Sequence, residues 1–257
     1  MEPSRPVFTV HPPGAPAPRP SGGEGFARGY GKTLLSMLVT IAVFAWWIGD
    51  WQVAAGVVVL IFVHEMGHVI AAKVLGMPVT APLFIPFIGA AIVMRENPRD
   101  AMTEALMAYA GPLAGCVGSW ACLWLAQQTS QLWLVEVAAI SFGLNLFNLI
   151  PVPPLDGGRV CAAVSRWFWL PGLLLIAGTM IVLHAWQMLL VGTLILGSAY
   201  QRIRDDMSHQ AEMRQYYRTS LPLRALVAAF YLGLIGVLLI GLSAANGLLP
   251  QAISFGN

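Results

Sequence analysis

His64, Glu65 and His68 belong to the stretch His-Glu-Met-Gly-His, whose residue types and spacing could support catalysis by a metal ion. Two histidines four positions apart lie on one face of an α-helix, about one turn from each other. Neutral imidazoles at that spacing suit a zinc ion, and the nearby carboxylate suits a general base that acts on a water polarised by the metal. The spacing therefore predicts a zinc-dependent hydrolytic site carried by one helix.

The residues around this motif are apolar. From residue 51 to residue 75, Glu65 and Lys73 are the only acidic or basic side chains apart from the histidines. A transmembrane helix needs about 20 mostly apolar residues, and ionisable groups at membrane depth are usually functional because they are costly there. The stretch is therefore predicted to be a transmembrane helix with a metal motif. The alternatives are a polar cluster that pairs with neighbouring helices and a proton or ion relay in a transporter.

The overall composition is that of a membrane protein. Of 257 residues, 57% are hydrophobic and 10% are charged, whereas soluble domains carry about 25% charged residues. The net charge of +2 indicates no nucleic-acid partner. The three cysteines, Cys116, Cys122 and Cys161, lie in apolar stretches without a CxxC pair, which favours buried free thiols over disulfides.

We expect an all-α polytopic membrane protein with about seven transmembrane helices and a short β-like re-entrant segment after the second helix. Residues 1–32 are rich in Pro and Gly and are expected to form a disordered cytoplasmic N-terminus. The remaining parts are a transmembrane core at 33–203, a polar cytoplasmic connector at 204–221, and a last transmembrane helix with a short tail at 222–257. The expected spans cover residues 33–49, 51–75, 99–127, 132–150 and 223–242, with a helical hairpin between 166 and 202 that turns near His184.

Residues 77–96 are apolar but too broken for a spanning helix. Pro78, Pro82 and Pro86 interrupt the run, and Gly89 divides its second half. Backbone at membrane depth that is not helical must pack on protein, so that its hydrogen-bonding groups find partners. We therefore predict a short β-like hairpin or re-entrant loop, with an interfacial loop as the alternative.

A further candidate ligand follows the helix that we expect to end near Ile150. Three prolines between residues 151 and 154 stop that helix at membrane depth and hold Asp156 on a rigid, non-helical turn. A catalytic zinc ion usually has three protein ligands, so the two histidines need a third partner. Depth and rigidity favour Asp156 for that role, and an ordinary turn carboxylate is the alternative, because Asp-Gly is common in turns.

The distribution of Lys and Arg predicts the orientation in the membrane. In a seven-span arrangement the groups of basic residues all fall on the same side, and the turns on the other side contain none. The positive-inside rule makes that side cytoplasmic, which predicts a multi-pass protein of the cell membrane with its N-terminus in the cytoplasm. The helix that carries His68 and the helix before Asp156 then both end near the cytoplasmic face.

Two separated motifs occur in order on the predicted transmembrane helices. The first is His64-Glu65-Met66-Gly67-His68, and the second combines Asn148-Leu149-Ile150-Pro151 with Leu155-Asp156-Gly157-Gly158. Together they resemble the site-2 protease family of intramembrane zinc metalloproteases. The stretch Gly111-Pro112-Leu113-Ala114-Gly115 and the apolar loop after the metal helix are also similar to that family, and the resemblance covers about residues 34–165.

The resemblance implies that one zinc ion per chain is held by His64, His68 and Asp156. Glu65 would activate a water for attack on a peptide carbonyl. Asn148 would help to place the substrate or stabilise the oxyanion, with a helix-packing hydrogen bond as the alternative. The substrate would be a transmembrane protein, cut within or near the bilayer to release a fragment, and membrane lipid is the other expected partner. An intramembrane metal or proton transporter that uses the same His/Glu/Asp cluster is the alternative function.

Overall fold

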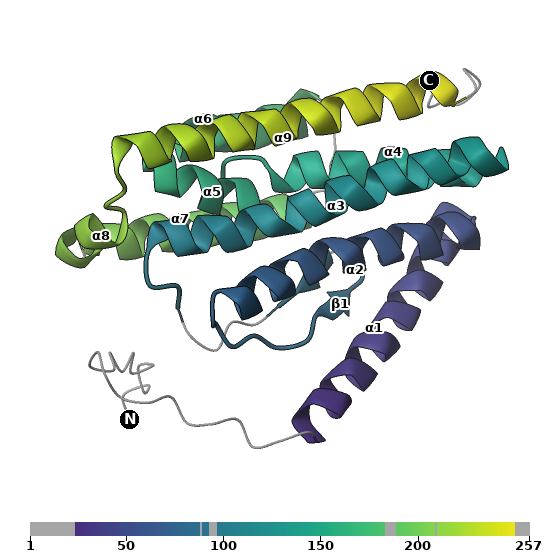
Figure 1. Ribbon diagram of the computed structural model, residues 1–257, viewed down its shortest axis with the longest axis horizontal. Coiled ribbons are helices and arrows are strands. Elements are labelled where there is room, and N and C mark those ends of the chain that lie inside the picture. Colours follow the sequence, from purple (N-terminus) through teal and green to yellow (C-terminus); the bar gives the residue numbers. More distant parts are fainter. Residues whose placement is uncertain (1–23, 88, 93–96, 183–188, 209, 250–257) are drawn as a thin grey trace.

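The computed structural model describes residues 24–87, 89–92, 97–182, 189–208 and 210–249 and is built mainly from helices (Figure 1). The long helices α2, α3, α4 and α9 pack side by side, α1 crosses them obliquely, and the small hairpin lies against α1 and α2. In chain order the elements are α1 (Glu24–Ile48), α2 (Trp51–Val74), β1 (Leu83–Ile85), β2 (Gly89–Ala91), α3 (Ala101–Thr129), α4 (Leu132–Asn148), α5 (Asp156–Val164), η1 (Arg166–Phe168), α6 (Trp169–Val182), α7 (Leu189–Ser208), α8 (Gln210–Tyr216) and α9 (Leu221–Leu248).

Among the described residues, four helices are long and apolar enough to cross a membrane, namely α1 from Tyr30 onward, α2, α3 and α9. The helix α4 has 17 residues and, like the segment 166–178, is apolar but shorter. Prolines follow soon after α4, and charged residues occupy the last part of α7, so neither helix continues as a long apolar span. The expected count of seven spans is not confirmed. The structure does confirm a mostly helical chain with apolar helices of membrane-spanning length and a small sheet.

The largest part of the core lies between α3, α4 and α9. Phe142 and Leu238 are fully buried there, and Leu123 is nearly so. Other apolar side chains of the long helices are exposed, for example Val117 and Leu232. Because lipid chains are as apolar as leucine, close packing between the helices contributes more to holding such a bundle together than transfer of apolar area out of water.

The hairpin predicted after α2 is confirmed. The strands β1 and β2 pair antiparallel, with Phe84 opposite Ala90. The Phe84 amide donates to the Ser36 hydroxyl oxygen of α1 at 3.1 Å. About one turn earlier on α1, the Thr33 hydroxyl donates to the Pro82 carbonyl at 2.6 Å. Two hydroxyl groups of α1 thus hold the backbone of the hairpin by hydrogen bonds.

The helix α1 begins earlier than the sequence suggests. It starts at Glu24, so residues 24–32 are helical and do not belong to a disordered N-terminus. The last proline before the helix is Pro20, and an acidic residue is favourable at a helix N-terminus, so the local sequence permits this earlier start. Residues 1–23 lie outside the described part of the chain.

The polar connector between the last spans is largely helical. The helix α7 continues to Ser208, and α8 covers Gln210–Tyr216. In Figure 1, α8 lies at the same end of the bundle as the end of α2 and the starts of α3 and α9, and the α1–α2 and α3–α4 turns lie at the opposite end. The basic residues of the connector therefore lie at the same end of the bundle as the last turn of α2, the helix that carries His64 and His68. The turn expected near His184 lies outside the described residues.

Candidate metal centre

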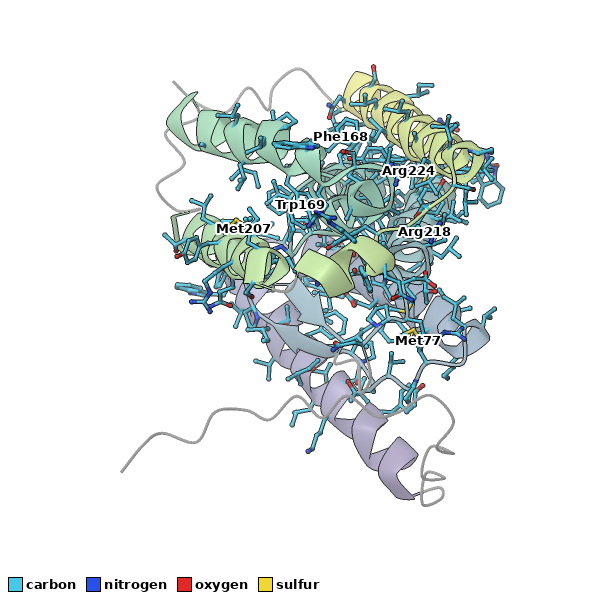
Figure 2. The ribbon with its side chains drawn as sticks, turned by 90° about the vertical axis from the view of Figure 1, so that its left-hand side faces the viewer. Met77, Phe168, Trp169, Met207, Arg218 and Arg224 are labelled. Atoms are coloured by element: carbon cyan, nitrogen blue, oxygen red, sulfur yellow. The ribbon has the colours of Figure 1, made fainter. Side chains whose placement is uncertain are left out.

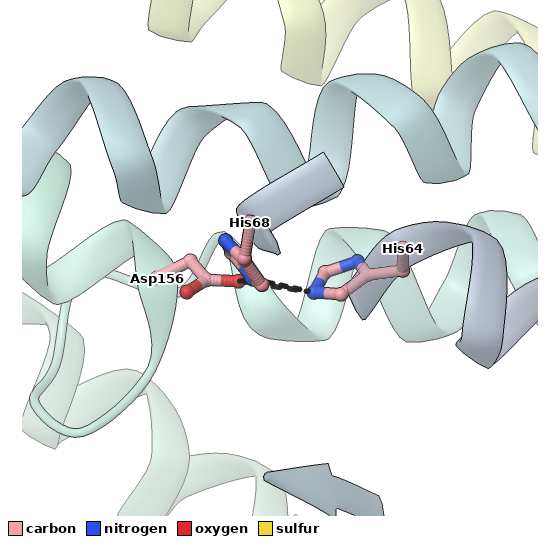
Figure 3. Close-up of side chains that lie close together, drawn as sticks. All are labelled: His64, His68 and Asp156. Carbon is pink, nitrogen blue, oxygen red and sulfur yellow. Dashed lines mark hydrogen bonds and ion pairs between the residues drawn. The ribbon is translucent and has the colours of Figure 1, made fainter. Parts of the chain in front are cut away.

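His64, His68 and Asp156 meet at one point of the bundle (Figure 3). The two histidines lie on α2, and Asp156 is the first residue of α5. The Nε2 atoms of the histidines are 3.1 Å apart, and each lies 3.2 Å from Asp156 Oδ2. Within the described part of the chain, this is the one group of three His, Cys, Asp or Glu side chains close enough to hold a metal ion.

The separations between these three atoms fit a tetrahedral zinc ion. Zinc bonds of about 2.0–2.1 Å to nitrogen and oxygen place neighbouring tetrahedral ligands roughly 3.3 Å apart. The observed separations of 3.1 and 3.2 Å lie close to that value. Two imidazoles and one carboxylate also leave a fourth position for water, which is the arrangement of catalytic zinc sites. The donor set therefore fits a catalytic zinc ion.

Asp156 begins a helix, whereas the sequence places it on a non-helical turn. The prolines stop α4, but α5 starts at Asp156 itself. A carboxylate in the first turn of a helix is favoured by the positive end of the helix dipole. Gly157 and Gly158 allow this helix to start against the preceding turn, because a Cβ at either position would overlap backbone atoms of Leu149 or Val152. The candidate ligand is thus fixed by a helix start packed on the end of α4.

The second ring nitrogens of both histidines are held by oxygen acceptors. His68 Nδ1 donates to the Met107 carbonyl at 2.8 Å, and His64 Nδ1 donates to the Asn145 side-chain oxygen at 2.9 Å. The Asn145 amide nitrogen donates to the Ser141 carbonyl at 2.8 Å, which turns its oxygen toward His64. A proton on each Nδ1 leaves both Nε2 atoms with lone pairs, as metal ligation requires.

Asn145 is a candidate functional residue that the sequence reasoning missed. That reasoning singles out Asn148, whose Nδ2 donates to the Leu144 carbonyl of its own helix at 3.2 Å. Asn145 instead contacts a candidate ligand and is only 3% exposed. A signal for it is present in the sequence, because Ser141 and Asn145 are four residues apart on a mostly apolar helix and so share one face.

The glycine motif of α3 lets the metal helix approach closely. A Cβ added at Gly111 would overlap the His68 ring, and one at Gly115 would overlap the Asn145 side-chain amide. On α2, a Cβ at Gly67 would overlap the backbone of α3. Small residues at helix contacts permit such close approach. The motif therefore positions His68 and the partner of His64.

Glu65 follows His64 on α2 and is 8% exposed. No described residue donates a hydrogen bond to its carboxylate, which lies within electrostatic reach of His64, His68 and Arg159. An acidic side chain on an apolar helix of membrane-spanning length is costly, which argues for a functional role. Its place beside the candidate ligands leaves it available to accept a proton from a water at the site.

The part of the chain that contains the candidate metal site is similar to known zinc peptidases. The sequence model of peptidase family M50 matches residues 52–136 and 124–170, which include the three candidate ligands and Glu65. This match supports the assignment to the site-2 protease family that the sequence motifs resemble. A zinc metalloprotease from Methanocaldococcus jannaschii is 31% identical over 111 residues, which make up 41% of this chain and 32% of that protein. The chain thus spans about a third of the length of this curated relative.

Residues outside the two sequence motifs also hold the backbone on either side of Asp156 in place. The Tyr231 hydroxyl of α9 donates to the Leu149 carbonyl, just after α4. Trp169 Nε1, near the end of the M50 region, donates to the Gly158 carbonyl of α5 at 2.9 Å. The position of Asp156 therefore depends on α6 and α9 as well as on the helices of the motif.

A second buried polar group, the Glu104 cluster, consists of Glu104, Arg159, Arg202 and Tyr216. Glu104 is 4% exposed and accepts hydrogen bonds from the Tyr216 hydroxyl at 2.6 Å and from Arg202 at 3.1 Å. Arg159 Nε lies 3.7 Å from its other oxygen. Burial and the adjacent Glu104 carboxylate raise the pKa of Tyr216 far above its usual value, so the hydroxyl keeps its proton. The cluster joins α3 and α5 to α7 and α8.

Proposed function

We propose that this chain is an intramembrane zinc endopeptidase that cleaves a transmembrane protein within or near the bilayer. The observation that carries the proposal is the tetrahedral spacing of three ligand atoms, two of them on α2, a helix of membrane-spanning length. The M50 match and the metalloprotease relative support the peptidase part. The apolar character of α2 and of the helices around it supports cleavage at membrane depth.

The residues of the site have separate tasks in this proposal. Zinc, when bound to the three ligands, would polarise a water molecule and lower its pKa toward neutrality. Glu65 takes a proton from that water and delivers it to the leaving amine. Asn145 and the Met107 carbonyl keep the two imidazoles oriented by accepting their Nδ1 protons. Asn148, partly exposed at the end of α4, is a candidate for contact with the substrate.

A transporter of metal ions or protons is the alternative function. It would need further acids or histidines along a path through the bilayer. In the described ranges, only His64, His68 and Asp156 are grouped closely enough to hold an ion. Glu65 next to them has a task in hydrolysis as a general base, and the peptidase proposal is therefore preferred.

The substitution Glu65→Gln tests the chemistry separately from the metal site. The amide keeps the size of the side chain but cannot accept the proton, so cleavage of co-expressed single-span membrane proteins should fall by about 10²–10⁴-fold relative to the wild type. Zinc measured on the same purified variant should stay at the wild-type level. Cleavage at the wild-type rate would overturn the proposed role of Glu65.

The hairpin offers an edge for an unwound substrate. A peptide bond in a transmembrane helix must be unwound before attack, and the freed backbone groups then need partners. The Phe84 amide points away from β2, toward Ser36, so its opposite residue Ala90 directs its own N–H and C=O away from β1. We propose that the substrate backbone pairs there as an added strand, by β-augmentation.

The substitution Ala90→Pro tests this edge, because it removes the outward N–H and leaves the bonds inside the hairpin in place. Loss of one hydrogen bond should lower cleavage by about three- to tenfold, and zinc content and expression should not change. The control Ala90→Val keeps the N–H and should cleave normally. If the proline variant also cleaves normally, the substrate is held elsewhere.

A further inference from the structure

Arg159 of α5 lies beside the metal centre but is not one of the candidate ligands. It follows Asp156 by three residues on the same helix, so the two side chains leave α5 as neighbours. Its ion-pair partner Glu104 precedes Met107 by three residues on α3, and the Met107 carbonyl accepts a hydrogen bond from His68. Along both helices, the pair of Arg159 and Glu104 therefore lies roughly 5 Å from the metal centre.

The segment of α5 that carries Arg159 is fixed by α6. Trp169 Nε1 donates to the carbonyl of Gly158, the residue directly before Arg159, at 2.9 Å. Trp169 is buried and packs with apolar residues of α3, α5 and α8. Figure 2 faces this end of the bundle, where Trp169 lies close to α8. The backbone from which the Arg159 side chain projects thus has a defined position.

The Arg159 guanidinium is held along one edge. Its Nε atom lies 3.7 Å from Glu104 Oε1. The other oxygen of that carboxylate, Oε2, accepts hydrogen bonds from Arg202 and from the Tyr216 hydroxyl. The terminal nitrogens of Arg159, which carry most of its N–H donors, have no acceptor in the part of the chain that the structure describes. One edge of the guanidinium is therefore oriented by a carboxylate, and the other has donors available.

These donors lie where a substrate would react. The Arg159 side chain is within electrostatic reach of the Glu65 carboxylate, the proposed general base. It is also 33% exposed, so an incoming ligand can reach it. A transmembrane substrate brings main-chain amides to this place, and unwinding frees their carbonyl oxygens from helical N–H partners. A carbonyl freed at an apolar site is costly until it accepts a hydrogen bond.

We propose that Arg159 binds the substrate, by donating from its terminal N–H groups to main-chain carbonyl oxygens that unwinding sets free. This inference rests on the proposed peptidase function and deepens it, because it names a residue that recognises the unwound state. A charged donor binds a carbonyl more strongly than a neutral one, and the planar guanidinium presents parallel donors to adjacent acceptors. Glu104 holds the opposite edge of the group and so directs these donors away from α3.

The binding of two synthetic single-span leucine peptides to zinc-loaded Glu65→Gln protein tests this contact without cleavage. One peptide has proline at its centre, and the other has alanine there. Proline has no N–H, so a carbonyl about one turn before it lacks a helical partner, whereas the alanine peptide keeps an intact helix. Fluorescence anisotropy of the labelled peptides in detergent should show several-fold tighter binding of the proline peptide.

Addition of Arg159→Gln to this protein should weaken binding of the proline peptide by roughly tenfold, because a charge-assisted hydrogen bond is lost. The alanine peptide, which offers no freed carbonyl, should bind as before. Arg159→Lys keeps a positive charge opposite Glu104, and so preserves the ion pair, but it lacks the planar fork and should still weaken the proline peptide several-fold. Zinc content, measured on each variant, should stay constant.

The matched control is Arg202→Gln, which removes the other arginine that bonds to Glu104 and should leave both peptide affinities unchanged. Equal weakening by this control, or equal weakening of both peptides by Arg159→Gln, would mean that Arg159 acts through packing and would overturn the contact. No preference for the proline peptide, or no measurable binding of it, would overturn the contact as well. Failure of the peptidase function gives a different result, in which Arg159-dependent binding persists but wild-type protein cleaves no co-expressed membrane protein.

Discussion

The metal centre and the Glu104 cluster are both buried and polar, but only one of them is complete without a further ion. In the Glu104 cluster, one carboxylate is matched by two guanidinium groups and a phenol. In the metal centre, two Nε2 atoms converge on one carboxylate oxygen, and no described residue donates a hydrogen bond to Glu65 next to them. A cluster whose carboxylate is matched in charge and hydrogen bonds within the protein needs no further ion, which is typical of a structural role. A cluster in which several lone-pair atoms point at one position can bind a cation there.

The largest expected difference between the two clusters is in zinc content. Wild-type protein should hold about one zinc ion, and Asp156→Ala should weaken zinc binding by more than about 100-fold. Removal of a residue that only hydrogen-bonds to a metal ligand already lowers metal affinity by about 10–100-fold, so removal of a ligand itself should cost more. Glu104→Gln is the control and should retain zinc, which elemental analysis of both purified variants measures. Full zinc in Asp156→Ala and in a companion His64→Ala variant would show that the ligand set is wrong.

A smaller effect is expected from the residue that orients His64. Asn145→Ala removes the acceptor for His64 Nδ1, so zinc affinity should fall by about 10–100-fold in a chelator competition. Asn148→Ala, one turn later on the same helix, should leave that affinity unchanged, since Asn148 bonds to its own helix. Equal losses in the two variants would mean that Asn145 acts through helix packing and not through the imidazole.

The smallest effect should be on the stability of the protein when the Glu104 cluster is changed. Glu104→Gln leaves Arg202 without its carboxylate, but the Arg202 side chain is 37% exposed, so solvent limits the loss to about 1–3 kcal/mol. Thermal unfolding of the detergent-solubilised protein should show a lower midpoint with unchanged zinc content. An unchanged midpoint would contradict a structural role for this cluster.

Features that depend on residues close in sequence could be predicted without the fold. His64 and His68 share a helix face because the α-helix repeats every 3.6 residues, and the apolar residues around them predict a membrane-length helix. The prolines after Ile150 predict the end of α4, and the broken segment after α2 predicts a hairpin. These are local effects of backbone geometry, so the sequence determines them by itself.

Other features required the tertiary structure. Asn145 is 81 residues from its partner His64, and Arg202 is 98 residues from Glu104, so no local rule joins them. The start of α5 at Asp156 is tied to contacts that Trp169 and other residues make with the surrounding backbone. Such pairs meet only after the helices have packed, because packing decides which faces touch and which polar groups lose water. The sequence alone thus determines which residues can bind a metal, and the packing of α2 against α3, α4 and α5 decides that they meet at one point.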